Sequence, residues 1–170
     1  LTLLLGGCSS VGGWVADLFK NPPTPLAPAA ELYATGELEM TKKRYEEARL
    51  PFRKVVERHP QSSYAPRARF LIGEAYYREG EFDKAIKEFE SFLAFFPRHE
   101  ISDLVQYRLA MSYYDQMKPV EQDQEITRKA QEAFKVLVRE YPESRYAADA
   151  LAIAITHWAH ARLAERGVLR

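Results

Sequence analysis

The sequence repeats a pattern of paired helices, and this repetition constrains the fold more than any other feature. An alanine, a phenylalanine and a proline recur 37 residues apart, as Ala48 and Ala85, Phe52 and Phe89, and Pro60 and Pro97. They recur again 45 residues further on, as Ala130, Phe134 and Pro142. A period of this size is typical of solenoids, in which each helix pair buries its apolar face against its neighbours. The sequence therefore predicts an all-α fold.

The middle copy matches the tetratricopeptide (TPR) pattern of small, aromatic and proline positions. Gly73 lets the first helix approach the second closely, and Phe89 fills the space between them. Gly80 can take the positive φ that a tight turn between two helices requires. Pro97 ends the second helix. We therefore expect a TPR-type α-solenoid of antiparallel helix pairs.

The array is expected to occupy residues 29–170. The units are placed at about 29–63, 64–100 and 101–145, with the first helix of a fourth unit from 146. That last helix should run from about Tyr146 to Glu165, and its partner helix is missing from the sequence. The chain starts without a methionine and stops within a repeat, so we interpret it as a piece of a longer array.

Two units depart from the pattern. In the first, Glu39 replaces the aromatic residue, and Pro51 lies inside the second helix. Proline removes a backbone hydrogen bond and clashes with the preceding turn, so we predict a bend between Arg49 and Pro51. In the third unit, Met117 to Thr127 should bulge between the two helices. This insertion carries Glu121, Gln122, Asp123 and Gln124.

The N-terminus reads as the end of a lipoprotein signal. Residues 1–7 are apolar but far shorter than the ~20 residues of a membrane-spanning helix, so they are interpreted as a signal-peptide remnant. Leu5-Gly6-Gly7-Cys8 matches the bacterial lipobox, which predicts that Cys8 is lipidated. Residues 8–28 would form a tether, which four prolines keep from being helical. By resemblance to lipoprotein sorting rules, Ser9 indicates the outer membrane.

Composition excludes several functions. With 24 basic and 24 acidic residues the net charge is zero, which argues against a nucleic-acid partner. A single cysteine excludes an internal disulfide and a cysteine-based zinc site. No nucleophile elbow, P-loop or zinc-protease motif is present, so we expect neither an enzyme nor a cofactor. His157 and His160 lack a third metal ligand, and the acidic insertion is too sparse for calcium.

The first helix of each unit should line the concave face of the array. On each first helix, one stripe of residues faces the core of the repeat, and a second stripe begins one residue later. In the three units this second stripe consists of Tyr33, Glu37 and Met40, then Phe70, Glu74 and Tyr77, then Tyr107, Met111 and Tyr114. Aromatic and methionine side chains at these positions suit a groove that binds peptides. The alternative is that they form the core between neighbouring repeats, and the sequence leaves both interpretations open.

The chain resembles the BamD family (also called ComL or YfiO) over almost its whole length. The most specific resemblance lies in Phe96-Pro97-Arg98-His99, in Glu121-Gln122-Asp123-Gln124 and in Thr127-Arg128-Lys129-Ala130. It implies a lipid-anchored, non-enzymatic scaffold on the periplasmic face of the outer membrane of a Gram-negative bacterium. The implied partners are unfolded outer-membrane proteins, the POTRA region of the barrel-forming assembly subunit, and other assembly lipoproteins.

Within this resemblance, the N-terminal units are implicated in recognising targeting peptides that end in an aromatic residue and a carboxylate. Arg67 lies one turn before Phe70 and Glu74, so it is the candidate partner of that carboxylate. Two other binding proteins remain as alternatives. One is a pilotin lipoprotein that escorts secretins, and the other is a periplasmic TPR regulator of cell-wall synthesis.

Overall fold

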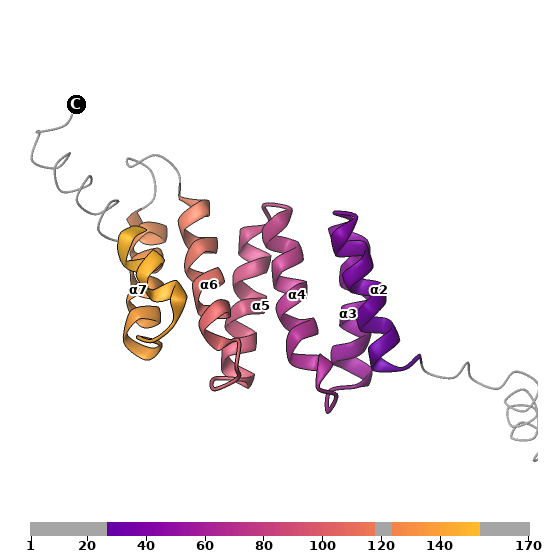
Figure 1. Ribbon diagram of the computed structural model, residues 1–170. Coiled ribbons are helices and arrows are strands. Elements are labelled where there is room, and N and C mark those ends of the chain that lie inside the picture. Colours follow the sequence, from indigo (N-terminus) through magenta and orange to yellow (C-terminus); the bar gives the residue numbers. More distant parts are fainter. Residues whose placement is uncertain (1–26, 118–123, 154–170) are drawn as a thin grey trace, which may run out of the picture.

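The computed structural model describes residues 27–117 and 124–153, and all its regular elements there are helices (Figure 1). The helices are α2 (Ala29–Thr41), α3 (Tyr45–Arg58), α4 (Tyr64–Arg78), α5 (Phe82–Phe95), α6 (Ser102–Gln116) and α7 (Gln124–Glu140). Residues 145–153 form a further helical stretch. The predicted all-α, TPR-type fold is confirmed.

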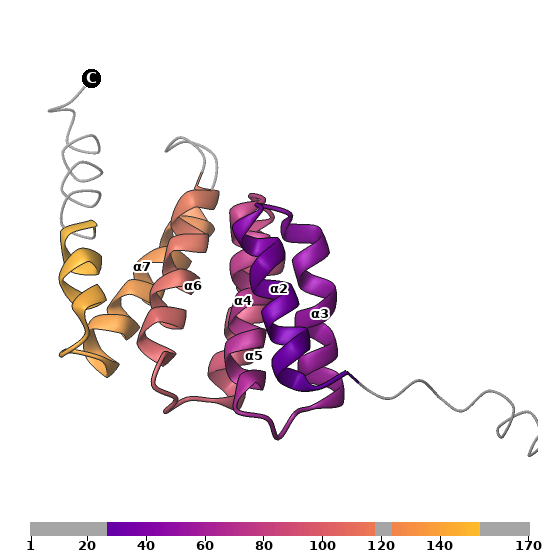
Figure 2. The same ribbon diagram turned by 45° about the vertical axis from the view of Figure 1, so that its right-hand side comes forward.

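The helices follow one another in a row, with the first and last described helices at opposite ends (Figures 1 and 2). Each helix packs on the next in sequence, and α4 also contacts both α2 and α6. In the described part of the chain, no such contact joins α3 to α5 or α5 to α7. The row therefore curves, with α2, α4 and α6 on the concave side and α3, α5 and α7 on the convex side.

A glycine and a phenylalanine hold each of the first two helix pairs together. A Cβ added to Gly36 would lie 2.5 Å from Phe52 Cε1, and one added to Gly73 would lie 2.6 Å from Phe89 Cε1. Both phenylalanines are fully buried. The glycines therefore let the rings fill the space between the helices, as the sequence predicts for Gly73 and Phe89.

Glu39, which replaces the aromatic residue in the first unit, has different partners from the equivalent Tyr76. The equivalent Tyr76 accepts a hydrogen bond from Arg53 of the preceding α3, at 2.6 Å. Among the described helices none precedes α2, and Glu39 instead forms ion pairs with Lys42 at 2.7 Å and Arg44 at 3.5 Å. Glu39 is thus paired with cations close to it in sequence.

The insertion is shorter than predicted, because α7 begins at Gln124 rather than after Thr127. The interpretation of Gln124 as a loop residue is therefore wrong. Glu125 and Lys129 form an ion pair 2.9 Å long one turn apart, and Ala130 begins the buried face of the helix. The ion pair and the buried face together explain why α7 begins within the segment expected to be a loop.

Two further features concern α3. The helix continues through Pro51, which is buried, and the bend expected there stays a prediction. Just after α3, the imidazole of His59 lies with Nε2 2.9 Å from the carbonyl oxygen of Ala27. A carbonyl can only accept, so Nε2 is the donor. This bond ties the chain just before α2 to the end of α3.

Candidate functional site

The predicted groove residues lie on α2, α4 and α6, which form the concave side of the array. All the apolar ones are half-buried, namely Tyr33, Met40, Phe70, Tyr77, Tyr107, Met111 and Tyr114. Glu37 is exposed, whereas Glu74 is buried with only 6% of its surface accessible. Each aromatic or methionine side chain thus packs partly on the core and leaves part of its surface accessible to solvent.

The inner row of aromatic residues, which consists of Tyr33, Phe70 and Tyr107, packs within and between repeats. Tyr33 meets the ring of Phe52 edge-on, with centroids 5.6 Å apart, and Tyr64 at 5.1 Å. Tyr107 stacks on Tyr146 of the following helical stretch at 5.1 Å. These contacts fix the rings from one side. Packing within and between neighbouring repeats thus accounts for one side of these rings, and the peptide-binding groove stays a prediction.

The outer row, which consists of Met40, Tyr77 and Tyr114, is also fixed by packing against neighbouring side chains. Tyr77 meets Phe82 edge-on at 5.7 Å, and Tyr114 meets Phe134 at 6.3 Å. Met40 packs against the core of the first repeat. Rings fixed by packing lose little conformational entropy when a ligand covers them, which favours binding.

A charged network joins α4 to α6 among the predicted groove residues. Arg78 Nε donates a 2.8 Å hydrogen bond to Glu74 Oε1. Arg108 Nη2 donates to the same oxygen at 3.3 Å, and Arg108 Nε lies 2.8 Å from Glu74 Oε2 without hydrogen-bond geometry. The guanidinium of Arg108 also lies over the ring of Tyr77, 5.2 Å from its centre. Tyr77 in turn donates its hydroxyl proton to Asp115.

Sequence reasoning placed Glu74 and Tyr77 in the groove but missed Arg108 and Asp115. A buried carboxylate is costly unless it is paired, so a glutamate on a stripe of apolar residues implied a nearby cation. The spacing within one repeat indicates Arg78, which lies one turn after Glu74, but it could not identify Arg108, which comes from the next repeat.

The phenols of Tyr33, Tyr77 and Tyr107 have raised pKa values. Burial, followed by the nearby charge of Glu37, raises the pKa of Tyr33 to about 12. Burial and the hydrogen bond to Asp115 raise the pKa of Tyr77 above its ordinary value. Burial likewise raises the pKa of Tyr107. These side chains therefore present neutral rings to a ligand.

Arg67 lies at the edge of the groove and already has a partner. Its Nη2 donates a 2.6 Å hydrogen bond to Glu100, in the turn before α6. Both side chains are more than half exposed, so water and other anions compete for this pair. Binding of a ligand carboxylate by Arg67 would require displacement of Glu100, and it stays a prediction.

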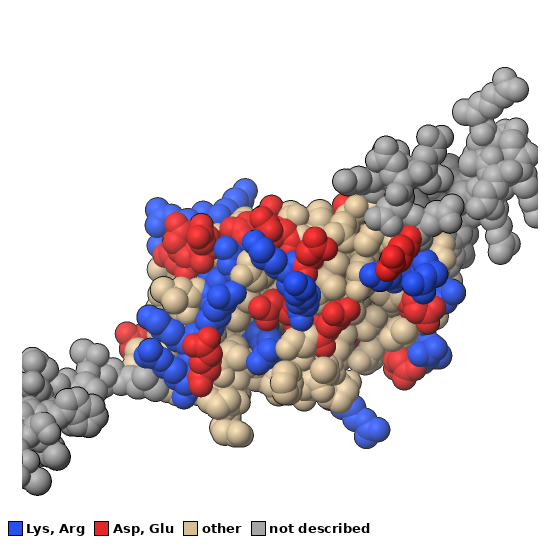
Figure 3. Space-filling view, turned by 180° about the vertical axis from the view of Figure 1, so that it is seen from behind, with Lys and Arg blue, Asp and Glu red and all other residues tan. Residues whose placement is uncertain are grey.

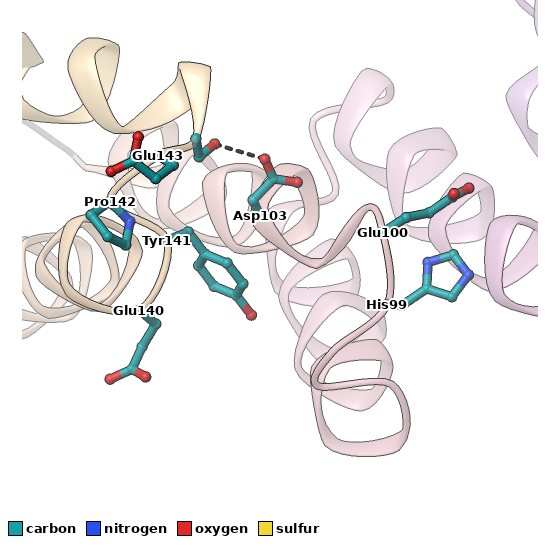
Figure 4. A pocket seen from close by; sticks show the side chains of 8 residues that line it. His99, Glu100, Asp103, Glu140, Tyr141, Pro142 and Glu143 are labelled. Carbon is teal, nitrogen blue, oxygen red and sulfur yellow. Dashed lines mark hydrogen bonds between the residues drawn. The ribbon is translucent and has the colours of Figure 1, made fainter.

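A second hollow lies at the edge of the array, where the α5–α6 turn faces the turn after α7 (Figure 4). It has a volume of about 410 Å³ and is lined by His99, Glu100, Asp103, Glu140, Tyr141, Pro142, Glu143 and Ser144. Ser144 donates a 2.7 Å hydrogen bond to Asp103, which closes one side. Across residues 27–117 and 124–153, no group of three side chains is arranged to bind a metal ion.

The convex face has a different character. Lysine and arginine side chains alternate there with acidic ones, and no large area of one sign is visible (Figure 3). Since nucleic-acid binding requires a concentrated basic surface, this face gives it no support.

Several predicted site residues lie outside the described ranges. These are Cys8, Glu121, Gln122 and Asp123, together with His157 and His160. None of the described helices is long and apolar enough to cross a membrane.

Comparison with known proteins adds an independent line of argument. A family model described as "YfiO: Outer membrane lipoprotein" matches residues 25–167. The chain is 31% identical over 146 residues to the outer membrane protein assembly factor BamD of Caulobacter vibrioides, covering 86% of the chain and 46% of the relative. It is 27% identical over 147 residues to the BamD of Rickettsia prowazekii, covering 86% and 55%.

A third relative, the BamD of Neisseria gonorrhoeae, is 29% identical over 132 residues, covering 72% of the chain and 49% of the relative. The chain thus spans about half the length of the curated relatives it matches. The family model covers most of the chain, including every described helix. This chain belongs to the YfiO family of outer membrane lipoproteins.

Proposed function

We propose that this chain is part of an outer membrane protein assembly factor, in which it acts as a non-enzymatic scaffold. The observation that carries the proposal is family membership, together with the role of its relatives as outer membrane protein assembly factors. In this role the concave groove binds segments of unfolded β-barrel proteins before they are inserted.

The groove has the chemistry that this role requires. Its half-buried aromatic and methionine side chains offer apolar surface to many sequences, because methionine adapts its shape and rings contact any apolar group. The net charge of the chain is zero, so long-range attraction does not select the client. Recognition instead depends on short-range contacts in the groove.

Two further parts of the proposal concern location and partners. Lipidation of Cys8 anchors the protein to the periplasmic face of the outer membrane, and residues 8–28 act as a tether. Stable anchoring takes more than one acyl chain, which the modification of bacterial lipoproteins provides. The scaffold also binds the POTRA region of the barrel-forming subunit and other assembly lipoproteins.

Site-specific crosslinking tests the groove. A photoreactive amino acid replaces Tyr77 or Tyr114, and the protein is mixed with an unfolded β-barrel protein. A matched control carries the same amino acid at Lys87, which is exposed on α5 of the convex side. We expect crosslinks from both groove positions and few from Lys87. Equal crosslinking from all three positions would show that binding is not confined to the groove.

Alanine substitution separates binding from stability. Tyr77→Ala removes a ring that lies half in the core and half in the groove, so we expect both the free energy of unfolding and client affinity to fall. A loss of stability with unchanged affinity would contradict the groove hypothesis.

A further inference from the structure

The guanidinium of Arg108 has one edge occupied and one edge available. Its Nε and Nη2 atoms face the carboxylate of Glu74, as described above. Nη1 has no hydrogen bond or ion pair with any residue that the structure describes. A guanidinium carries five N–H donors in one plane, so the edge formed by Nη1 and Nη2 can still receive a carboxylate with two parallel hydrogen bonds.

The side chain of Arg108 is partly accessible to solvent. The Nε atom of Arg108 is buried, yet the side chain as a whole is 23% exposed. The exposed part therefore lies elsewhere on the side chain than at Nε. Arg108 directly follows Tyr107 of the inner aromatic row and covers the ring of Tyr77 of the outer row. A ligand that lies along both rows must pass this side chain.

The surroundings hold Arg108 in place without using all its donors. Glu74 is buried and faces two guanidinium groups, Arg78 and Arg108, so one carboxylate serves two cations. Asp115, the other nearby carboxylate, is bonded to the hydroxyl of Tyr77. A guanidinium fixed by an ion pair and by an aromatic ring loses little freedom on binding, which favours an anion at its open edge.

We propose that Arg108, positioned by Glu74 and Tyr77, binds a carboxylate of the peptide segment held in the groove. The inference rests on the proposed function and names a feature of the ligand, which is a carboxylate flanked by apolar or aromatic residues. It assigns to Arg108 the role that the sequence suggested for Arg67, whose guanidinium lies at the groove edge and is engaged by Glu100.

The test measures binding of fluorescent peptides to the full chain by anisotropy. All peptides share one sequence of alternating phenylalanine and threonine. The first has a free C-terminal carboxylate, the second has an amidated C-terminus and one internal aspartate, and the third is amidated and has no carboxylate. The first two peptides distinguish a terminal carboxylate from a side-chain carboxylate, and the third measures binding by the apolar rows alone.

We expect the wild-type protein to bind at least one acidic peptide roughly tenfold to a hundredfold more tightly than the neutral one, the range for a hydrogen bond to a charged group. Arg108→Gln should remove this preference while the neutral peptide still binds. Arg108→Lys keeps the charge that faces Glu74 but not the planar edge, so it should reduce the preference with less effect on folding. Thermal unfolding of each variant shows whether the fold is retained.

Arg67→Gln is the matched control, because it removes a guanidinium from the same face of the groove. It should leave the preference unchanged. Loss of the preference in Arg67→Gln, with no change in Arg108→Gln or Arg108→Lys, would overturn the assignment. An equal loss of affinity for acidic and neutral peptides in both Arg108 variants would show that Arg108 only supports the fold. Failure of the wild-type protein to bind any of the peptides would instead count against the groove itself, and thus against the proposed function.

Discussion

Lys43 and Gly80 occupy the same position in consecutive turns between paired helices, and both have a left-handed backbone, with φ of 59° and 77°. The turns also share their hydrogen bonds, since Lys43 N donates to Met40 O at 3.0 Å and Gly80 N donates to Tyr77 O at 3.0 Å. The turn geometry is thus a property of the repeat. In the first repeat it is adopted by a residue whose side chain disfavours it.

Exchanging residues at this position should therefore change stability in opposite directions. A left-handed conformation costs a non-glycine residue about 1–2 kcal/mol, part of which is offset by the greater freedom of glycine in the unfolded chain. We expect Lys43→Gly to raise the free energy of unfolding by about 0.5–1 kcal/mol and Gly80→Ala to lower it by about 1 kcal/mol. Urea-induced unfolding followed by circular dichroism measures both. A destabilising Lys43→Gly would mean that contacts of the lysine side chain outweigh backbone strain.

The close approach of α4 and α5 gives a second prediction. A methyl group at Gly73 would collide with the ring of Phe89, which is fully buried and cannot move freely. We expect Gly73→Ala to lower the free energy of unfolding by about 1–3 kcal/mol, the usual cost of overpacking a core. The double variant with Phe89→Leu should cost less than the sum of the two single variants, because the smaller side chain makes room for the methyl group. Additive costs would show that the two residues do not compete for space.

Alkaline pH should weaken the fold through its tyrosines. Burial raises the pKa of Tyr113 from 10.0 to about 12, with a contribution from its hydrogen bond to Glu90, and the pKa of Tyr33 also rises to about 12. Because the folded state holds these protons more tightly than the unfolded state, the stabilisation is complete below pH 10 and is lost between about pH 10 and 12. Unfolding free energies measured across this range should fall with rising pH. Tyr113→Phe should make the decline shallower, and an unchanged slope would contradict the assignment.

The repeat made most of the fold predictable from sequence. The recurrence of Ala48, Phe52 and Pro60 at a fixed offset indicated both the helix pairs and their packing. The roles of Gly73 and Phe89 also followed, because each depends on contacts within one repeat. The start of α7 was less predictable, since a helix can extend into an insertion when its first turn is stabilised locally, as Glu125 and Lys129 do here.

The candidate site was predictable only in part. The stripe of Tyr33, Phe70 and Tyr107 follows from helical periodicity, but its half-burial depends on how neighbouring repeats stack. The link between Glu74 and Arg108 joins residues 34 positions apart in different repeats, a distance that no local pattern encodes. Sequence reasoning therefore identified the apolar stripe and Glu74, while the pairing of Glu74 with Arg108 became visible only in three dimensions.

The bond between His59 and Ala27 has a mechanical consequence. A pull on the N-terminal segment reaches the array at Ala27, and the imidazole of His59 transfers part of that load directly to the end of α3. Without this bond the force would act on α2 alone and could peel it away from the row. We expect the first helix pair to yield as one unit under tension, and the substitution His59→Ala to let α2 detach at a lower force in single-molecule pulling.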